Sequence, residues 1–265
     1  MDPLTYLRCP LCHDSVAVTP QAVRCARGHG FDRARQGYVN LATGRVPHSG
    51  DTAEMVAART EFLAAGHYDF VAAALAAAAR WAYPGGVVVD AGAGTGWHLA
   101  AVLDALPGAP GLALDVSKAA LRRAARAHPR AGAALCDTWG RLPLADGVAG
   151  LIVNVFAPRN GAEFRRVLRP DGALLVVTPA GDHLAELVDR LGLLRVDPDK
   201  ADRMAASLAG HFTLAAQDML RRKLKLSAVE AQALVAMGPS AWHDTPPPPP
   251  IEVTASIRLA AYIPR

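Results

Sequence analysis

Three cysteines and one histidine near the N-terminus have the spacing of a metal site. Cys9 and Cys12 form a Cys-x2-Cys pair, and Cys25 and His29 form a Cys-x3-His pair after twelve intervening residues. Two such pairs can converge on one tetrahedral zinc ion, because thiolates and imidazole are its usual ligands. Four protein ligands leave no open position, so we expect a structural zinc that stabilises a short module. His13, beside Cys12, is an alternative ligand, although the paired spacing favours His29.

A glycine-rich loop is the second feature that can do chemistry. Residues 87–96 read VVVDAGAGTG, an apolar run closed by an acid and followed by glycine at every second position. A buried strand, a glycine loop and a helix over residues 97–106 form the usual start of a nucleotide-binding sheet, because glycine lets a ligand approach the backbone closely. The alternative is a tight strand–helix turn without a ligand. The residues predicted to contact a cofactor here are Asp90, Gly92, Gly94, Thr95 and Gly96.

Two further acids follow the glycine loop. Asp115 ends the strand predicted over residues 111–115, roughly twenty residues beyond the loop, where an acid can accept both ribose hydroxyls of a nucleoside. Asp137 follows the strand predicted over residues 131–136 and is placed to reach an adenine amine. The alternatives are a surface carboxylate near a helix start for Asp115 and a turn residue for Asp137.

The loop after the next predicted strand is the candidate substrate site. It follows the strand over residues 149–155 and runs from Asn154 to Pro158. Ligands of open α/β sheets bind beyond the carboxyl ends of the strands, so this loop should face the substrate. Asn154 offers hydrogen-bond donors and an acceptor, and Phe156 offers a ring that can stack. We therefore predict that Asn154 and Phe156 serve catalysis by holding the reacting group.

Alternating strand and helix patterns position these residues. They indicate an α/β fold with a doubly wound, seven-stranded sheet. The predicted strands cover residues 87–90, 111–115, 131–136, 149–155, 173–178, 213–227 and 251–263. Helices are predicted from Asp51, with Glu54 completing a capping box, and over residues 70–82, 97–106, 117–128, 159–168, 183–193, 197–210 and 227–237. The five prolines at 246–250 predict a stiff polyproline connector.

The charge is concentrated in the N-terminal part of the chain. Residues 1–50 contain six arginines and three aspartates, a net +3 that leaves only +1 of the total +4 for the rest. A small basic module suggests a polyanionic partner, and the alternative is a solvated face. Arg33 and Arg35 lie near Phe31 and Tyr38, a mixture that can contact RNA, although the two aromatic residues can equally pack under the metal site.

The chain divides into three parts on these criteria. Residues 1–45 form a zinc-binding RNA-recognition module, residues 46–84 a linker and helical lead-in, and residues 85–265 the catalytic domain. The N-terminus lacks the apolar segment of a signal peptide, and the apolar run over residues 70–79 is too short to span a membrane. We therefore expect a cytoplasmic protein without a membrane partner, in which free thiols are the rule.

The motifs taken together resemble the 23S rRNA (guanine-N1-)-methyltransferases along nearly the whole chain. The segments that carry the resemblance are CPLC, FDRARQGYVNL, DTAEMVAAR, GHY, VVDAGAGTG, LDVSK, NVFAPRN, VTPAGDHLAELVD and MGPSAW. Residues 154–160 and 182–196 are most similar to the tylosin-resistance subgroup, which modifies a guanine in a hairpin lining the ribosomal peptide tunnel. The resemblance implies a class I fold, S-adenosylmethionine and structural zinc as cofactors, 23S rRNA as partner, macrolide resistance and a homodimer.

The resemblance also implies roles for individual residues. Tyr68, Gly94, Thr95 and His183 match positions that contact the cofactor, and Cys9, Cys12, Cys25 and His29 match the zinc ligands. Guanine N1 carries a proton, so transfer needs a base or an enolate-stabilising donor. Asp137 and His183 are candidates, and the alternative is that either serves the cofactor alone. The five-proline run departs from the family pattern and leaves the geometry before the last strand open.

Two functions from other classes are alternatives. A small-molecule S-adenosylmethionine-dependent methyltransferase would share the glycine loop but would not need a basic zinc module. A non-enzymatic zinc-dependent RNA-binding protein would need the module but not the cofactor acids. The choice of methyl acceptor distinguishes all three.

Overall fold

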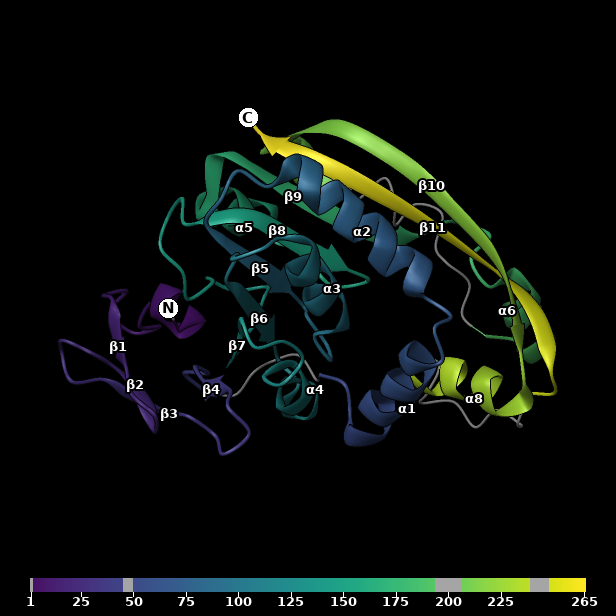
Figure 1. Cartoon of the computed structure of the whole chain (residues 1–265), viewed down its shortest axis with the longest axis horizontal. Helices are drawn as coiled ribbons and strands as arrows, with labels where there is room; N and C mark the ends of the chain where they lie inside the picture. The colour runs from purple at the N-terminus through teal and green to yellow at the C-terminus, as the bar shows by residue number, and fades with distance from the viewer. Residues whose placement is uncertain (1, 45–49, 194–205, 239–247) are drawn as a thin grey trace.

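A single mixed sheet organises the protein in this computed structural model, which describes residues 2–44, 50–193, 206–238 and 248–265. Figure 1 shows the N-terminal module at one side of this sheet and a long pair of antiparallel strands at the other. In sheet order the strands of the described residues are β10 (Phe212–Leu226), β11 (Ile251–Pro264), β9 (Leu168–Pro179), β8 (Ala149–Val155), β5 (Val87–Ala91), β6 (Gly111–Asp115), β7 (Ala131–Leu135) and β4 (Val39–Asn40).

The central strands are parallel and buried on both faces. β9, β8, β5, β6, β7 and β4 pair in parallel, whereas β11 pairs antiparallel with both β9 and β10. Continuous apolar runs suit such strands because helices cover both sides of a parallel sheet. The helices are α1 (Ala53–Ala64), α2 (Asp69–Ala82), α3 (Trp97–Ala105), α4 (Lys118–Ala124), α5 (Gly161–Val167), α6 (Ala185–Leu191) and α8 (Ala228–Ala236).

The α/β class is confirmed, but the expected count of seven strands is wrong for the described residues. The eighth strand is β4, in which Val39 pairs with Ala134 and Asn40 with Leu135 of β7. A two-residue strand is too short to show a periodic pattern, so no sequence pattern predicts it. The module therefore joins the sheet edge directly.

The N-terminal module shares a core with the sheet. It has its own three-stranded sheet of β1 (Val16–Val18), β2 (Ala22–Cys25) and β3 (Gly30–Asp32), preceded by η1 (Pro3–Tyr6). Leu4, Leu7 and Val23 are fully buried in one apolar cluster with Val89 and Leu114 of the central strands. The helix α5 contributes to the same cluster, whereas α2, α3 and α8 pack in the cluster on the opposite face. The module therefore packs against the sheet through a shared apolar core.

Several predicted helix boundaries are wrong by a few residues. Thr52, not Asp51, caps α1, because its side chain accepts a hydrogen bond from the Met55 N–H. Asp51 instead forms an ion pair with Arg59. Leu184 has a φ of 58°, which delays the start of α6 to Ala185. The capping box at Ser227 and Glu230 is complete.

Some predicted elements lie partly outside the described residues. Of the helix predicted over 197–210, residues 206–209 are described and helical, and residues 197–205 are outside. Of the polyproline connector, residues 248–250 are described and belong to no helix or strand, and residues 246–247 are outside.

No single helix of the described residues is both long and apolar enough to cross a membrane. α1 and α2 meet the length and composition criteria only as a pair, and that pair is bent by 81° at its break.

Candidate functional site

The predicted metal ligands converge at one point. The ligand atoms of Cys9, Cys12, Cys25 and His29 all lie within 4.8 Å of one another. The Cys12 and Cys25 Sγ atoms are 3.6 Å apart, and His29 Nδ1 is 3.3 Å from Cys25 Sγ. Ligands of a tetrahedral zinc thiolate site are separated by about 3.8 Å, so the donor set and spacing fit zinc. His13 is exposed and outside this cluster, which leaves His29 as the imidazole ligand.

The glycine loop needs glycine at each of its three alternate positions. Gly92, Gly94 and Gly96 have φ values of 80°, 54° and 79°, in the region that side chains disfavour. A Cβ atom added to Gly92 would lie only 2.4 Å from Cβ of Ala157. The loop and the segment after β8 are therefore in close contact, and Gly96 is the N-cap of α3.

Two of the three predicted cofactor acids lie beside this loop: Asp90 is buried and Asp115 is half-buried. The Gly94 N–H donates to Oδ2 of Asp115 at 2.8 Å, and the Ser117 N–H donates to Oδ1 at 2.8 Å. Asp90 is 2% exposed, and its Oδ1 has no hydrogen-bond partner. Burial and the nearby charge of Asp115 raise the pKa of Asp90 to about 8. An unpartnered carboxylate oxygen with a second acid nearby fits a ligand with a positive charge and hydroxyl groups.

Arg59 of α1 lies against the glycine loop, a position that sequence reasoning missed. Its Nη1 would be 3.4 Å from a Cβ atom on Gly94 and pairs with the Asp51 carboxylate. Its Nη2 donates to the carbonyl of Met237 at 2.8 Å. The partner Met237 is 178 residues away in the chain, so no local pattern could have indicated this contact.

Three rings gather where the strands end. The ring centroids of Tyr68 and Phe156 are 6.2 Å apart, and those of Phe156 and His183 are 6.0 Å apart. The Ser256 N–H donates to Nδ1 of His183, which assigns the ring proton to Nε2, 3.3 Å from the Tyr68 hydroxyl oxygen. Burial lowers the pKa of His183 to about 4 and raises that of Tyr68. Both side chains are therefore neutral hydrogen-bonding groups.

The two residues predicted to serve catalysis differ in exposure. Phe156 is 42% exposed and has a φ of 51°. Asn154 is fully buried, and its Nδ2 donates to the carbonyls of Ala91 and Pro158 at 2.8 and 2.9 Å. The Asn154 donors thus hold the loop against β5, and only the unpartnered Oδ1 remains for another group.

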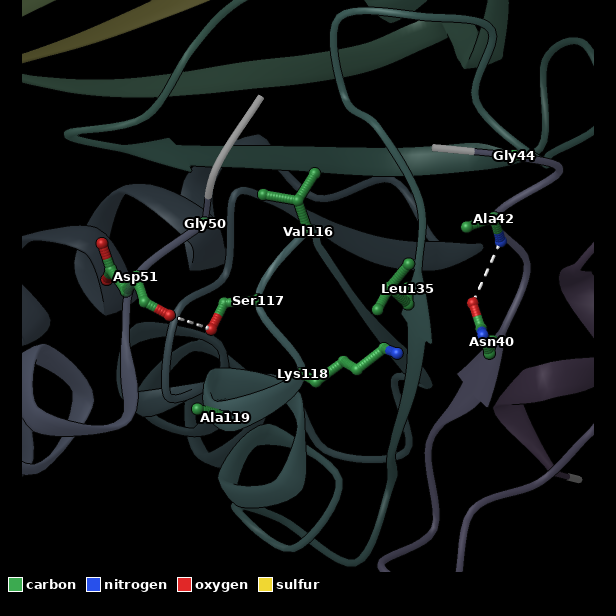
Figure 2. A pocket seen from close by; sticks show the side chains of 10 residues that line it. All are labelled: Asn40, Ala42, Gly44, Gly50, Asp51, Val116, Ser117, Lys118, Ala119 and Leu135. Carbon is green, nitrogen blue, oxygen red and sulfur yellow. Dashed lines mark hydrogen bonds between the residues drawn. The ribbon is translucent and has the colours of Figure 1, made fainter. Parts of the chain in front are cut away.

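A pocket of about 490 Å³ lies next to Asp115, between the N-terminal module and the ends of β6 and β7. Figure 2 shows Ala42 and Asn40 on one side and Gly50 and Asp51 on the other. The lining residues are Asn40, Ala42, Gly44, Gly50, Asp51, Val116, Ser117, Lys118, Ala119 and Leu135. Three of them come from the segment that leaves the module, so the module helps to build this pocket.

The other residues that were predicted to contact the cofactor or RNA make hydrogen bonds or packing contacts within the chain. Asp137 Oδ1 accepts a hydrogen bond from the Trp139 N–H at 2.9 Å. Phe31 is partly buried against the apolar cluster that contains Cys9 and Cys25, so it packs beside the metal site as the alternative expected. Tyr38 is buried in the other cluster, so it packs in the core but not under the metal site. Arg33 Nε donates to the Gly37 carbonyl at 3.1 Å.

Comparison with known proteins identifies both parts of the chain. Residues 7–43 match the family model of the N-terminal zinc ribbon of RlmA, and residues 89–176 match that of a methyltransferase domain. Among solved structures, YcgJ of Bacillus subtilis is similar with a TM-score of 0.50 at 16% identity, covering 72% of this chain and 97% of that one. This likeness supports the fold alone.

Two relatives are similar over most of the chain. One, from Micromonospora griseorubida, is 63% identical over 99% of both chains and is named "Putative 23S rRNA (guanine-N(1)-)-methyltransferase". The other is the 23S rRNA (guanine(748)-N(1))-methyltransferase of Streptomyces fradiae, 54% identical over 91% of this chain and 87% of its own. The chain therefore belongs to the 23S rRNA (guanine-N1-)-methyltransferase family.

Proposed function

We propose that this protein transfers a methyl group from S-adenosylmethionine to N1 of a guanine in 23S rRNA, and that this guanine is number 748. The name of the relative from Streptomyces fradiae specifies guanine 748 as the base that it methylates. The observation that carries the proposal is the combination, in one chain of this family, of the four clustered metal ligands with the acids Asp90 and Asp115 at the glycine loop.

The cofactor-binding residues act mainly through electrostatics and close approach. S-adenosylmethionine, when bound, supplies a methyl group activated by a positive sulfonium. Asp115 is proposed to hold the ribose, and Asp90 to favour the positive charge from its buried position. The backbone of the glycine loop is proposed to approach the nucleoside closely at Gly92, Gly94, Thr95 and Gly96. Tyr68 and His183 are proposed to offer hydrogen bonds to the ligand beside the ring of Phe156.

The proton on N1 sets the second requirement. His183 is a poor base in this arrangement, because Nδ1 accepts from Ser256 and burial holds its pKa near 4. We therefore propose that His183 and Tyr68 act as hydrogen-bond donors to the ligands. Asp137 is proposed to bind the adenine amine through its carboxylate, whose Oδ1 also fixes the following turn.

The substrate base is proposed to lie at the loop after β8. N1 is hidden in a paired guanine, so the base must be unpaired or flipped out of its stack. Phe156 is exposed there and can stack on it, while Asn154 shapes the loop and keeps Oδ1 available. Residues 1–45 are proposed to recognise the rRNA, residues 46–84 to connect, and residues 85–265 to perform the transfer.

Two consequences follow from the family resemblance. We propose that methylation confers macrolide resistance of the tylosin type, which a susceptible strain expressing the protein would show as an increased inhibitory concentration. We also propose a homodimer, which light scattering would test. The edge strand β10 exposes Leu214 and Met219, at 49% and 54%, and so offers an apolar surface for a second copy.

The test of function is the choice of methyl acceptor. Radiolabelled S-adenosylmethionine is incubated with the protein and naked 23S rRNA, with ribosomes, or with a metabolite extract. Label in 23S rRNA supports the proposal, whereas label only in small molecules would favour a small-molecule methyltransferase. RNA binding without any transfer would favour a non-enzymatic binding protein.

A further inference from the structure

An exposed tryptophan lies at the carboxyl edge of the sheet and has no role in the site described so far. Trp139 follows Asp137 in the segment after β7, and half of its surface, 50%, is exposed. Single exposed apolar residues are common on proteins, so exposure alone indicates nothing. Trp139 differs from other exposed apolar residues in its position near the substrate loop and in the hydrogen bonds that hold its backbone.

The segment that carries Trp139 is held to the substrate loop. Asn160, which lies two residues beyond this loop and caps α5, donates from Nδ2 to the Trp139 carbonyl at 2.7 Å. The Trp139 N–H donates to Asp137 Oδ1 at 2.9 Å, and the Leu142 N–H donates to Glu163 Oε2 at 2.8 Å. The backbone around the ring is therefore fixed before any ligand arrives, which lowers the entropic cost of binding.

The chemistry of this position suits single-stranded RNA. Unpaired bases stack on aromatic side chains, and nearby cations contact the phosphates. Arg141 is exposed two residues after Trp139. A guanine that leaves its stack exposes the faces of its neighbours, so an aromatic ring beside the entry of the target base has a natural partner.

We propose that Trp139 stacks on an unpaired nucleobase that neighbours the modified guanine. This inference rests on the proposed rRNA substrate. It assigns to Trp139 a positioning role for RNA, separate from the cofactor site and from the zinc module. The ring would hold the RNA strand while the target base occupies the loop of Phe156.

The chain contains a matched control. Trp81 is 68% exposed and lies in the last turn of α2, which leads through Tyr83 to the amino end of β5. It is therefore at the opposite edge of the sheet from the carboxyl ends that carry the site. Replacing it tests the loss of an exposed tryptophan without loss of the proposed contact.

The experiment compares Trp139→Ala, Trp139→Phe and Trp81→Ala, each saturated with S-adenosylhomocysteine and titrated with an rRNA hairpin containing the target guanine. Trp139→Ala should weaken RNA binding by about 5- to 150-fold, the effect typical of losing one stacked base. Trp139→Phe should restore most of the affinity, because it keeps a ring. Trp81→Ala should bind as wild type, and cofactor affinity should be unchanged in all three.

Fluorescence gives a second readout. RNA should quench tryptophan emission in the wild type, and Trp139→Phe should lose most of that quenching while still binding. RNA binding by Trp139→Ala equal to that of Trp81→Ala would overturn the inference, as would a loss confined to cofactor affinity. If the wild type itself fails to bind the hairpin, the proposed function fails first and this inference with it.

Discussion

The backbone N–H of Gly94 donates a 2.8 Å hydrogen bond to the Asp115 carboxylate, which joins the glycine loop to the end of the neighbouring strand. Asp115 also accepts from the Ser117 N–H, and the Ser117 hydroxyl donates to the carbonyl of Asp51 at 2.7 Å. One carboxylate thus connects the glycine loop, the start of α4 and the linker from the zinc module. Changes at this point should affect cofactor binding before anything else.

Asp115→Asn should weaken S-adenosylmethionine binding by about 1–3 kcal/mol, the usual cost of leaving polar partners unsatisfied. Isothermal titration calorimetry measures this directly. Asp104→Asn is the control, because Asp104 is on α3 with a side chain that is 76% exposed. Equal affinities for wild type and Asp115→Asn would remove Asp115 from the ribose site.

Cofactor affinity should depend on pH through Asp90. Its pKa is raised to about 8 in the free protein, and a bound positive charge favours the ionised form and lowers that pKa. Affinity should therefore increase as pH rises towards 8, by up to about tenfold per pH unit, and then level off. Asp90→Asn should lose this dependence. The difference between the affinity–pH profiles of the wild type and Asp90→Asn gives the contribution of Asp90 to the pH dependence. Parallel profiles for the two proteins would contradict its proposed role.

Cys25→Ser should abolish zinc binding and lower the thermal midpoint. Elemental analysis should give one zinc per wild-type chain, and each 1 kcal/mol of lost stability lowers Tm by roughly 2–4 °C in a chain of this size. Cys136→Ser is the matched control, because Cys136 is buried outside the ligand cluster. Zinc retained by Cys25→Ser, or lost equally by Cys136→Ser, would be incompatible with the assigned ligands.

Zinc loss should also weaken cofactor binding. Asn40 of β4 and Ala42 and Gly44 of the segment after it line the pocket beside Ser117, so disorder in the module removes one wall. Calorimetry with Cys25→Ser should show reduced S-adenosylmethionine affinity, whereas Cys136→Ser should keep it. Unchanged affinity in zinc-free protein would mean that the module and the cofactor site are independent.

Arg35→Ala should flatten the salt dependence of RNA binding by about one unit, as expected for one lost phosphate contact. Arg35 is exposed. Arg33, in contrast, donates a hydrogen bond to the Gly37 carbonyl, and its Nη1 lies 3.5 Å from Oδ2 of Asp2. Arg33→Ala should therefore lower the stability of the module instead. Filter binding at several salt concentrations and thermal unfolding separate the two effects. An unaltered slope for Arg35→Ala would remove this arginine from the RNA surface.

The parts of the site that the sequence predicted are those written in short contiguous motifs. The glycine loop, Asp115 and the zinc pairs depend on local spacing, and each lies where expected. The strand β4 was missed because two residues carry no periodicity. Arg59 was missed because its contacts are set by tertiary packing across 178 residues.

Residue types alone also did not indicate which partners the polar side chains bind. Asn154 was predicted from its hydrogen-bonding groups, but its donors bind backbone carbonyls inside the protein. Thr52 and Asp51 are both good caps in sequence, and the ion pair with Arg59 decides between them. Such choices depend on partners that fold into place from distant parts of the chain.

The most direct test of the central claim is primer extension on 23S rRNA from cells that express this protein and lack their own enzyme for guanine 748. A methyl group on N1 blocks base pairing, so reverse transcriptase should stop one nucleotide before guanine 748. Expression of Asp115→Ala should abolish the stop. Full-length extension through this guanine with the wild-type protein, or a stop at another base, would contradict the account.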